Sequence, residues 1–241
     1  MFEPLEILHE DAACIVLHKP AGLLTQAPLG IESLEFRVKQ FLMTRDGQVG
    51  EVYLGVPHRL DRPVSGVIVF AKNRKAARRI SEQFEARSVE KTYWALVAGN
   101  VSPEAGTWVD YLKKIDGEAR SEVVAETDSL GLKAVLHFRV QRIVGEFTLL
   151  EIQLETGRTH QIRVQCSAHG HPLVGDRLYG STDNFGPVTD DERARLIALH
   201  ARTLRFKLPV SKEPQTFVAP LPKLWQDYGV VEPADSLGGS E

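Results

Sequence analysis

The sequence has few cysteines, no long apolar run and no excess of basic residues. Its two cysteines, Cys14 and Cys166, make no disulfide framework, which excludes a small disulfide-stabilised secreted protein and leads us to expect a reducing cytoplasm. The apolar run at residues 12–17 has the length of a strand and is too short to cross a membrane. The first residues are acidic and lack the charged-then-apolar order of a signal peptide.

The net charge of the whole chain is close to zero, but basic residues are concentrated in one segment. The formal net charge of −3 is unlike that of the basic domains that usually bind nucleic acid. Residues 72–91 nevertheless carry seven basic and three acidic side chains, a local excess of four positive charges. Such a stripe can hold a phosphate backbone. A solvated helix face with intrahelical ion pairs explains the same residues equally well.

The apolar pattern predicts many strands and few helices. With 241 residues and 43% apolar residues, the chain suits one large domain or two small ones. Alternation and short apolar runs predict strands at 13–18, 67–71, 92–97, 133–143, 146–156 and 203–208. Helical spacing predicts helices at 33–43, with Ser33 as N-cap, and at 74–86. This combination predicts an α+β domain around a mixed, largely antiparallel sheet.

Three segments place polar and charged residues beside apolar strands. They are residues 57–66, residues 91–95, and residues 156–163 followed by 169–176. In the first segment, Asp61 lies close to two arginines, Arg59 and Arg62. As a surface ion pair, this contributes at most ~1 kcal/mol. As a functional group, a carboxylate beside a guanidinium stays ionised and can act as a nucleophile or a base.

The third segment can provide such a guanidinium. Gly157 permits a sharp turn after a strand, and Thr159 is a plausible N-cap for a helix that contains Arg163. Arg158 and Arg163 are five positions apart and need not point the same way. One of them can bind phosphate while the other pairs with a carboxylate, and an ordinary exposed arginine is the alternative for either.

Five segments follow one another along the chain: Lys19-Pro20-Ala21-Gly22-Leu23-Leu24, His58-Arg59-Leu60-Asp61 with Ser65-Gly66, Lys91-Thr92-Tyr93, Gly157-Arg158-Thr159-His160-Gln161-Ile162-Arg163 with Gly170-His171-Pro172 and Gly175-Asp176, and Leu199-His200-Ala201. Taken together, they resemble the motifs of the RluA-like family of RNA pseudouridine synthases, over about residues 10–220. Their order and spacing are more specific than any single segment. Because only 18 residues precede Lys19, we expect the chain to lack the small N-terminal RNA-binding domain (S4 type) of many relatives.

The resemblance implies a single catalytic domain at 1–228, with helices flanking the sheet and a central active-site cleft. Residues 229–241 are expected to form a disordered tail. The implied activity is that of an isomerase that converts uridines of ribosomal or transfer RNA to pseudouridine. The expected partner is RNA, with no membrane association, and the expected state is a monomer. Because the reaction imports no group and oxidises nothing, no cofactor or metal is expected.

The resemblance also assigns roles to single residues. Asp61 becomes the essential carboxylate, and attack on the ribose C1′, attack on the uracil ring and removal of the 2′ proton are all compatible with it. Arg163 is expected to pair with Asp61, and Tyr93 to pack against the uracil and handle a proton. Ile162 is expected to form an apolar wall beside the base. Arg59 is expected to enter the space left by the extruded base or to hold its phosphate.

The remaining predicted residues support the site or bind RNA. His58, Lys72 and Arg158 are predicted to contact the substrate RNA. Lys19, with Pro20, is predicted to be a turn residue that braces the site from behind.

Four other readings of the same residues are open to test. Cys166, His169 and His171 suggest zinc, although three ligands are a poor set, and Cys166 alone suggests a thiol nucleophile. A non-catalytic RNA-binding protein with this fold would be free to lose the catalytic residues. A hydrolase would need a second carboxylate, for which Asp176 is the candidate in these segments.

Overall fold

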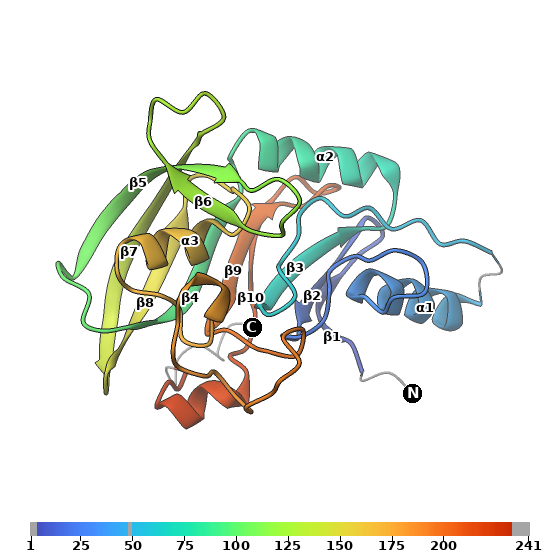
Figure 1. Cartoon of the computed structure of the whole chain (residues 1–241). Coiled ribbons are helices and arrows are strands. Elements are labelled where there is room, and N and C mark those ends of the chain that lie inside the picture. The colour runs from blue at the N-terminus through green and yellow to red at the C-terminus, as the bar shows by residue number, and fades with distance from the viewer. Residues whose placement is uncertain (1–3, 48–49, 233–241) are drawn as a thin grey trace.

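In the computed structural model, which describes residues 4–47 and 50–232, ten strands form one sheet (Figure 1). The strands are β1 Glu6–Glu10, β2 Cys14–Lys19, β3 Ser65–Ala71, β4 Glu90–Ala98, β5 Ala105–Lys114, β6 Ser121–Val124, β7 Leu132–Val144, β8 Phe147–Leu154, β9 Leu199–Lys207 and β10 Pro214–Val218. Their order is β1-β2-β3-β9-β4-β8-β7-β5-β6, and β10 pairs with β9. Among these strands only β3 and β9 pair in parallel. The predicted α+β class and largely antiparallel sheet are confirmed.

Helices cover both halves of this sheet. They are α1 Leu34–Asp46, α2 Arg74–Glu85, α3 Gln161–Ala168 and the short 3-10 helices η1 Arg177–Tyr179 and η2 Lys223–Tyr228. Helix α1 begins where predicted, because the Ser33 hydroxyl accepts the Phe36 N–H. Asn73 caps α2 in the same way. Helix α2 packs against β3 and β9, whereas α3 packs against β5 and β6 (Figure 1).

The parallel contact between β3 and β9 joins the two halves of the sheet. It pairs Ser65 with His200 and Gly66 with Ala201. Gly66 has φ +126°, and a Cβ there would lie 2.3 Å from the Ala201 carbonyl oxygen. The close approach of the two backbones therefore requires glycine. The Ser65 hydroxyl lies 2.8 Å from His200 Nδ1 and adds a buried side-chain hydrogen bond.

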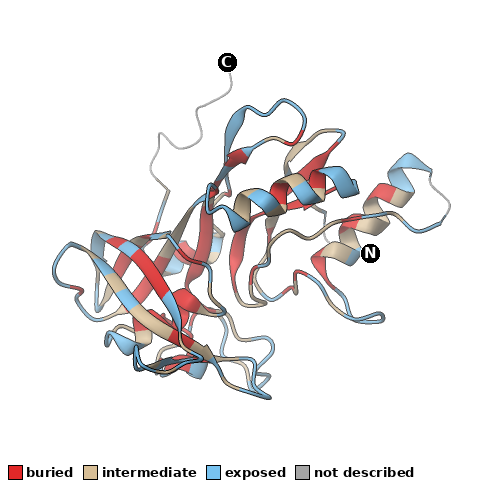
Figure 2. Cartoon of the chain, turned by 90° about the horizontal axis from the view of Figure 1, so that it is seen from above, coloured by how far each residue is buried: buried red, intermediate tan, exposed pale blue. Residues whose placement is uncertain are grey.

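The core runs along the central strands, where buried residues are concentrated (Figure 2). Strand β3 is buried at every position, as its apolar sequence predicted. Four strands were not predicted: the edge strands β1, β6 and β10, and the ten-residue strand β5 beside β6. They carry few buried residues, so their sequences hold little apolar alternation.

Within residues 4–47 and 50–232, no helix is both long and apolar enough to span a membrane.

The predicted C-terminal tail lies largely outside the described residues, from 233 onwards. Of its described part, Val230 is fully buried and Glu232 accepts a hydrogen bond from Arg202. The division into a domain at 1–228 and a tail stays a prediction.

Candidate active site

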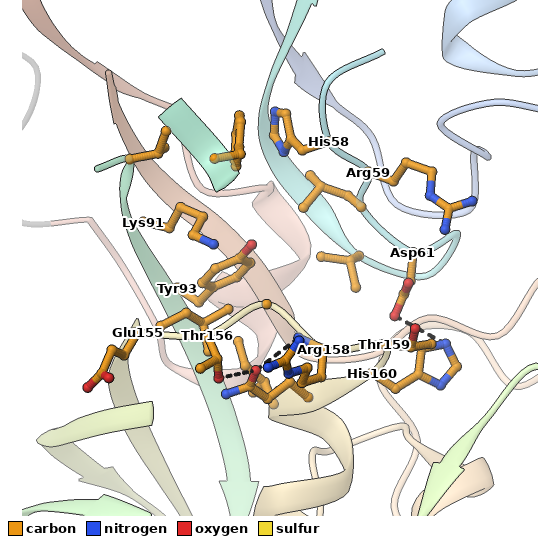
Figure 3. A pocket seen from close by; sticks show the side chains of 18 of the residues that line it. His58, Arg59, Asp61, Lys91, Tyr93, Glu155, Thr156, Arg158, Thr159 and His160 are labelled. Atoms are coloured by element: carbon orange, nitrogen blue, oxygen red, sulfur yellow. Dashed lines mark hydrogen bonds and ion pairs between the residues drawn. The ribbon is translucent and has the colours of Figure 1, made fainter. Parts of the chain in front are cut away.

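Two cavities meet at Asp61. The first, of about 550 Å³, lies between the loop before β3, strand β4 and the turn that enters α3 (Figure 3). The second, of about 850 Å³, extends from the same loop toward β5, η1 and the segment before β9. Both cavities share Arg59, Leu60, Asp61, Thr159, His160 and Arg163. A ligand in either cavity therefore reaches the Asp61 carboxylate.

The loop that carries Asp61 is held from behind by the first motif. The Lys19 amine is fully buried and donates hydrogen bonds to the carbonyls of Pro20, Leu23 and Arg62. The Thr25 hydroxyl donates to the Leu60 carbonyl and accepts the Leu60 N–H. The backbone is thus fixed on both sides of Asp61. This geometry supports the bracing role predicted for Lys19.

The Asp61 carboxylate faces two nitrogen groups. Its Oδ2 lies 3.4 Å from Arg163 Nη1 and 3.4 Å from His160 Nε2. The Asp61 side chain is 36% exposed, whereas that of Arg163 is 7% exposed. The pair therefore joins a buried guanidinium to a carboxylate that a ligand can still reach. Both come from segments far apart in the sequence, as predicted.

The closer partner of Arg163 is Asp176, which the sequence prediction did not pair with it. Arg163 Nε lies 2.7 Å from Asp176 Oδ2, and Nη2 lies 2.8 Å from Oδ1. Asp176 is buried and follows Gly175, whose φ of +88° forms the turn. Burial opposes the charge of Arg163, but its hydrogen bonds to Asp176 raise its pKa. Arg163 therefore stays a cation, held by one carboxylate while it faces another.

The turn into α3 differs from the prediction at its cap. Thr159 is not the N-cap; this position belongs to His160, in the left-handed region at φ 56°, with no side-chain cap bond. The Gln161 side chain instead accepts hydrogen bonds from the Thr156 hydroxyl and the Arg158 N–H, which close the turn. A left-handed histidine is strained, and such strain is common at functional sites.

The same turn directs the His160 ring toward Asp61. Its Nδ1 lies 2.9 Å from the Tyr179 hydroxyl, which accepts the Ser121 N–H. Burial lowers the pKa of His160, and the nearby Asp61 charge partly opposes this. The ring is thus fixed beside the carboxylate in a mainly neutral form.

An aromatic and an aliphatic side chain form the wall of the first cavity. Tyr93 comes from β4 and Ile162 from the first turn of α3. Burial, and then the Asp61 charge, raise the pKa of Tyr93, so its hydroxyl stays protonated. Such a wall suits a flat ring with polar edges.

The predicted RNA-binding residues lie in different places. Arg59 is exposed and lines both cavities, and Arg158 lines the first while its Nε donates to the Lys133 carbonyl. His58 also lines the first cavity, where its Nε2 accepts the Val69 N–H and burial lowers its pKa to about 3. It therefore has a structural hydrogen bond as well as access to the cavity.

Lys72 lies outside both cavities. It follows β3, whereas Asp61 precedes this strand, so the two are separated by the strand's whole length. Its amine bonds to Glu10 Oε1 at 2.6 Å and to the Asp11 carbonyl. The geometry does not bring it to the site, and its RNA contact stays a prediction.

Sequence reasoning assigned no role to three residues that face the site. They are Lys91, His160 and Tyr179. Lys91 and His160 lie inside quoted motifs, so their positions were visible although their orientation was not. Tyr179 had no signal in the sequence pattern.

The rival readings lose support from this geometry. His169 bonds to Asp110 and stacks on Trp108, while His171 bonds to the Ala98 carbonyl, so the two histidines and Cys166 share no ligand site. Burial raises the pKa of the Cys166 thiol, which disfavours a thiolate nucleophile. Asp176 is buried and both of its oxygens accept hydrogen bonds from Arg163, which disfavours it as the second carboxylate of a hydrolase.

Comparison with known proteins agrees with these motifs. The family described as RNA pseudouridylate synthase matches residues 13–168. Ribosomal large subunit pseudouridine synthase D of Xylella fastidiosa is 36% identical over 227 residues, with 91% of this chain and 67% of that protein covered. The protein of the same name from Xanthomonas campestris is 38% identical over 229 residues, with the same coverages of 91% and 67%. The chain thus spans about two thirds of the length of these relatives.

The fold is also similar to that of a protein described as an RNA pseudouridylate synthase. The solved structure of human RNA pseudouridylate synthase domain containing 4 superposes with a TM-score of 0.75 at 27% identity. The match covers 92% of this chain and 91% of the human one. The two folds are therefore similar over nearly the whole of both chains.

Proposed function

The chain belongs to the RNA pseudouridylate synthase family, and we propose that it isomerises a uridine in RNA with Asp61 as the essential carboxylate. The observation that carries the assignment of Asp61 is its place at the junction of the two cavities. It is a partly exposed carboxylate, 3.4 Å from a buried guanidinium that a second carboxylate already holds. An ionised carboxylate that a ligand can reach is what the reaction needs.

The reaction exchanges one bond of the nucleoside for another. The bond between ribose C1′ and uracil N1 breaks, the uracil turns, and C5 bonds to C1′. Substrate and product are isomers, so the base leaves and returns without an added group. A glycoside hydrolase normally needs two carboxylates because one of them must activate water. Here no water takes part, and one carboxylate suffices.

The described geometry gives each neighbour of Asp61 a role in this proposal. Arg163 faces Asp61 with a positive charge, and Asp176 keeps Arg163 oriented. Tyr93 and Ile162 form the wall against which the uracil ring packs. The second cavity then accommodates the RNA next to the target nucleotide.

A target base in a stacked helix must leave the stack to reach Asp61, at a cost of a few kcal/mol. Arg59 lines both cavities and is exposed, so it is placed to fill the vacated space or to hold the phosphate. Its guanidinium can stack on bases and bind phosphate. Arg158 offers a second cation at the rim of the first cavity.

Large-subunit ribosomal RNA is the substrate that we propose, because the similar bacterial proteins are named for it. Transfer RNA is the alternative substrate. We further propose that the enzyme acts as a monomer in the cytoplasm. Light scattering of the purified protein and fractionation of cells test these two points, and a stable dimer or a membrane-bound pool would contradict them.

The decisive experiment maps pseudouridine in total RNA from cells that lack the gene and from cells complemented with variants. The wild-type gene should restore one or more sites, whereas Asp61→Asn should restore none and still fold and bind RNA. Asp227→Asn, an exposed carboxylate outside both cavities, is the control and should behave as wild type. If no site depends on the gene, the chain is a non-catalytic RNA-binding protein. If Asp61→Asn stays active, another group is the catalyst.

A further inference from the structure

Lys91 places an amine in the first cavity on the same strand as Tyr93. Both residues lie on β4 and line the cavity, whereas Thr92 between them does not. Alternation along the strand explains this, because residues two apart point to the same face. Figure 3 shows both side chains projecting into the cavity, with Tyr93 between Lys91 and Asp61.

The amine has no counter-ion in the part of the chain that the structure describes. Its only described contact is with the Phe84 ring, whose centroid lies 5.8 Å from Nζ. Three other lysines, Lys39, Lys72 and Lys113, each bond to a carboxylate. Burial lowers the pKa of Lys91, which reflects the cost of a half-buried charge without a partner.

The residue that faces the Lys91 amine, Gly157, has no side chain. A Cβ at Gly157 would lie 3.6 Å from Lys91 Nζ, so the residue opposite contributes no side chain that could shield it. Glu85 and Glu155 also line the cavity, but neither forms an ion pair with Lys91 in the described chain. A half-buried donor that faces an open cavity and has no ion-pair partner in the described chain is suited to an anionic oxygen of a ligand.

The position of Lys91 relative to Asp61 indicates which ligand oxygen its amine would contact. If the uracil packs on Tyr93 with its ribose at Asp61, the edge of the ring farthest from the ribose points toward Lys91. This edge carries a carbonyl oxygen. When the bond between C1′ and N1 breaks, the electron pair stays with the uracil and spreads over N1 and the carbonyl oxygens. Charge thus develops where the Lys91 amine can reach it.

We infer that Lys91 is a further catalytic residue, which donates a hydrogen bond to a carbonyl oxygen of the departing uracil and stabilises its negative charge. Lys91 keeps its proton throughout. When C5 then bonds to C1′, the C5 proton leaves, N1 takes up a proton, and the negative charge disappears. This inference rests on the proposed function, since it assigns a residue to that same reaction. A donor aimed at developing charge is typically worth about 10²–10³ in rate.

The test measures binding and chemistry separately, on a synthetic RNA that carries a uridine mapped as described above. Lys91→Met should lower the single-turnover rate of bound RNA by about 10²–10³ and change the Kd by less than about threefold. Lys91→Arg should recover part of the rate, because it restores a cationic donor. Lys223→Met, an exposed lysine outside both cavities, should match wild type.

Two results would overturn the inference. A weaker Kd with an unchanged rate of bound RNA would mean that Lys91 holds a phosphate, and unchanged values of both would mean that it does nothing for this substrate. Thermal unfolding checks that Lys91→Met is folded, and Lys91→Arg provides a second, charge-preserving variant. Failure of the wild type itself to form pseudouridine would reject the proposed function, which separates the two failures.

A modified substrate tests directly whether Lys91 contacts a carbonyl oxygen of the uracil. Replacing the carbonyl oxygen by sulfur, in RNA with 4-thiouridine or 2-thiouridine at the target, weakens the acceptor. At the position that Lys91 contacts, the sulfur should slow the wild type more than it slows Lys91→Met. If both enzymes respond equally to both substitutions, Lys91 does not contact the base.

Discussion

The Asp176 carboxylate clamps the Arg163 guanidinium, with its oxygens 2.7 Å from Nε and 2.8 Å from Nη2. Both side chains are almost completely buried, at 1% and 7% exposure. The clamp leaves Nη1 to face Asp61 at 3.4 Å. The guanidinium is thus fixed from behind, while the Asp61 carboxylate in front stays open to a ligand.

Replacing Asp176 with Asn should destabilise the protein and slow it. The substitution leaves a buried guanidinium without its closest counter-ion, which typically costs about 3–5 kcal/mol. Urea unfolding should show this loss as a lower midpoint. The surviving folded enzyme should also be slower, since Arg163 is free to turn away from its position beside Asp61.

A surface ion pair provides the control for this prediction. Arg78 and Glu82 are four residues apart on α2, and their side chains are 82% and 55% exposed. Glu82→Gln should change the free energy of unfolding by no more than about 0.5 kcal/mol. If Asp176→Asn costs as little as Glu82→Gln, the clamp is not what holds Arg163.

Residues that were predicted to act together do meet in the structure. Asp61, Tyr93, Ile162 and Arg163 all line the first cavity. They were recognisable because each lies in one of the segments that resemble the motifs of the family. The two helices with regular apolar spacing were equally visible, and Ser33 caps α1 as predicted.

Features that depend on tertiary contacts were not predictable from local pattern. Asp176 lies 13 residues after Arg163 at a turn, and nothing in that spacing shows that it accepts two hydrogen bonds from one guanidinium. His160 adopts a left-handed conformation that its sequence neighbours do not indicate. That Lys91 has no counter-ion among the described residues is visible only once the nearby carboxylates have been placed.

Gly66→Ala should weaken the junction between β3 and β9. The new methyl group would meet the Ala201 carbonyl oxygen at 2.3 Å, and φ is +126°. Strain and overpacking each cost about 1–3 kcal/mol, so the unfolding free energy should fall by about 2–6 kcal/mol. The folded variant should also be less active than the wild type, because Asp61 lies in the loop that leads into this junction.

Gly117→Ala is the matched control for this substitution. Gly117 also has a positive φ, +76°, but no atom lies within 4 Å of its added Cβ. It should therefore cost only the ~1–2 kcal/mol of a left-handed alanine. Equal losses for the two variants, by urea unfolding, would mean that the backbone contact with Ala201 is unimportant.

Lys19 should make the stability of the protein depend on pH in an identifiable way. Burial lowers the pKa of Lys19 from 10.5 to about 7, with the Asp61 charge opposing this. Between these values the unfolded chain binds a proton that the folded protein lacks, so the folded state gains stability as the pH rises. The gain is at most about 1.4 kcal/mol per pH unit. Lys19→Met should be less stable, because the carbonyls around the amine lose their hydrogen-bond donor, and its disadvantage should widen from pH 7 to pH 10. Urea unfolding of both proteins over this range provides the measurement, and parallel curves would show that the amine stays charged when buried.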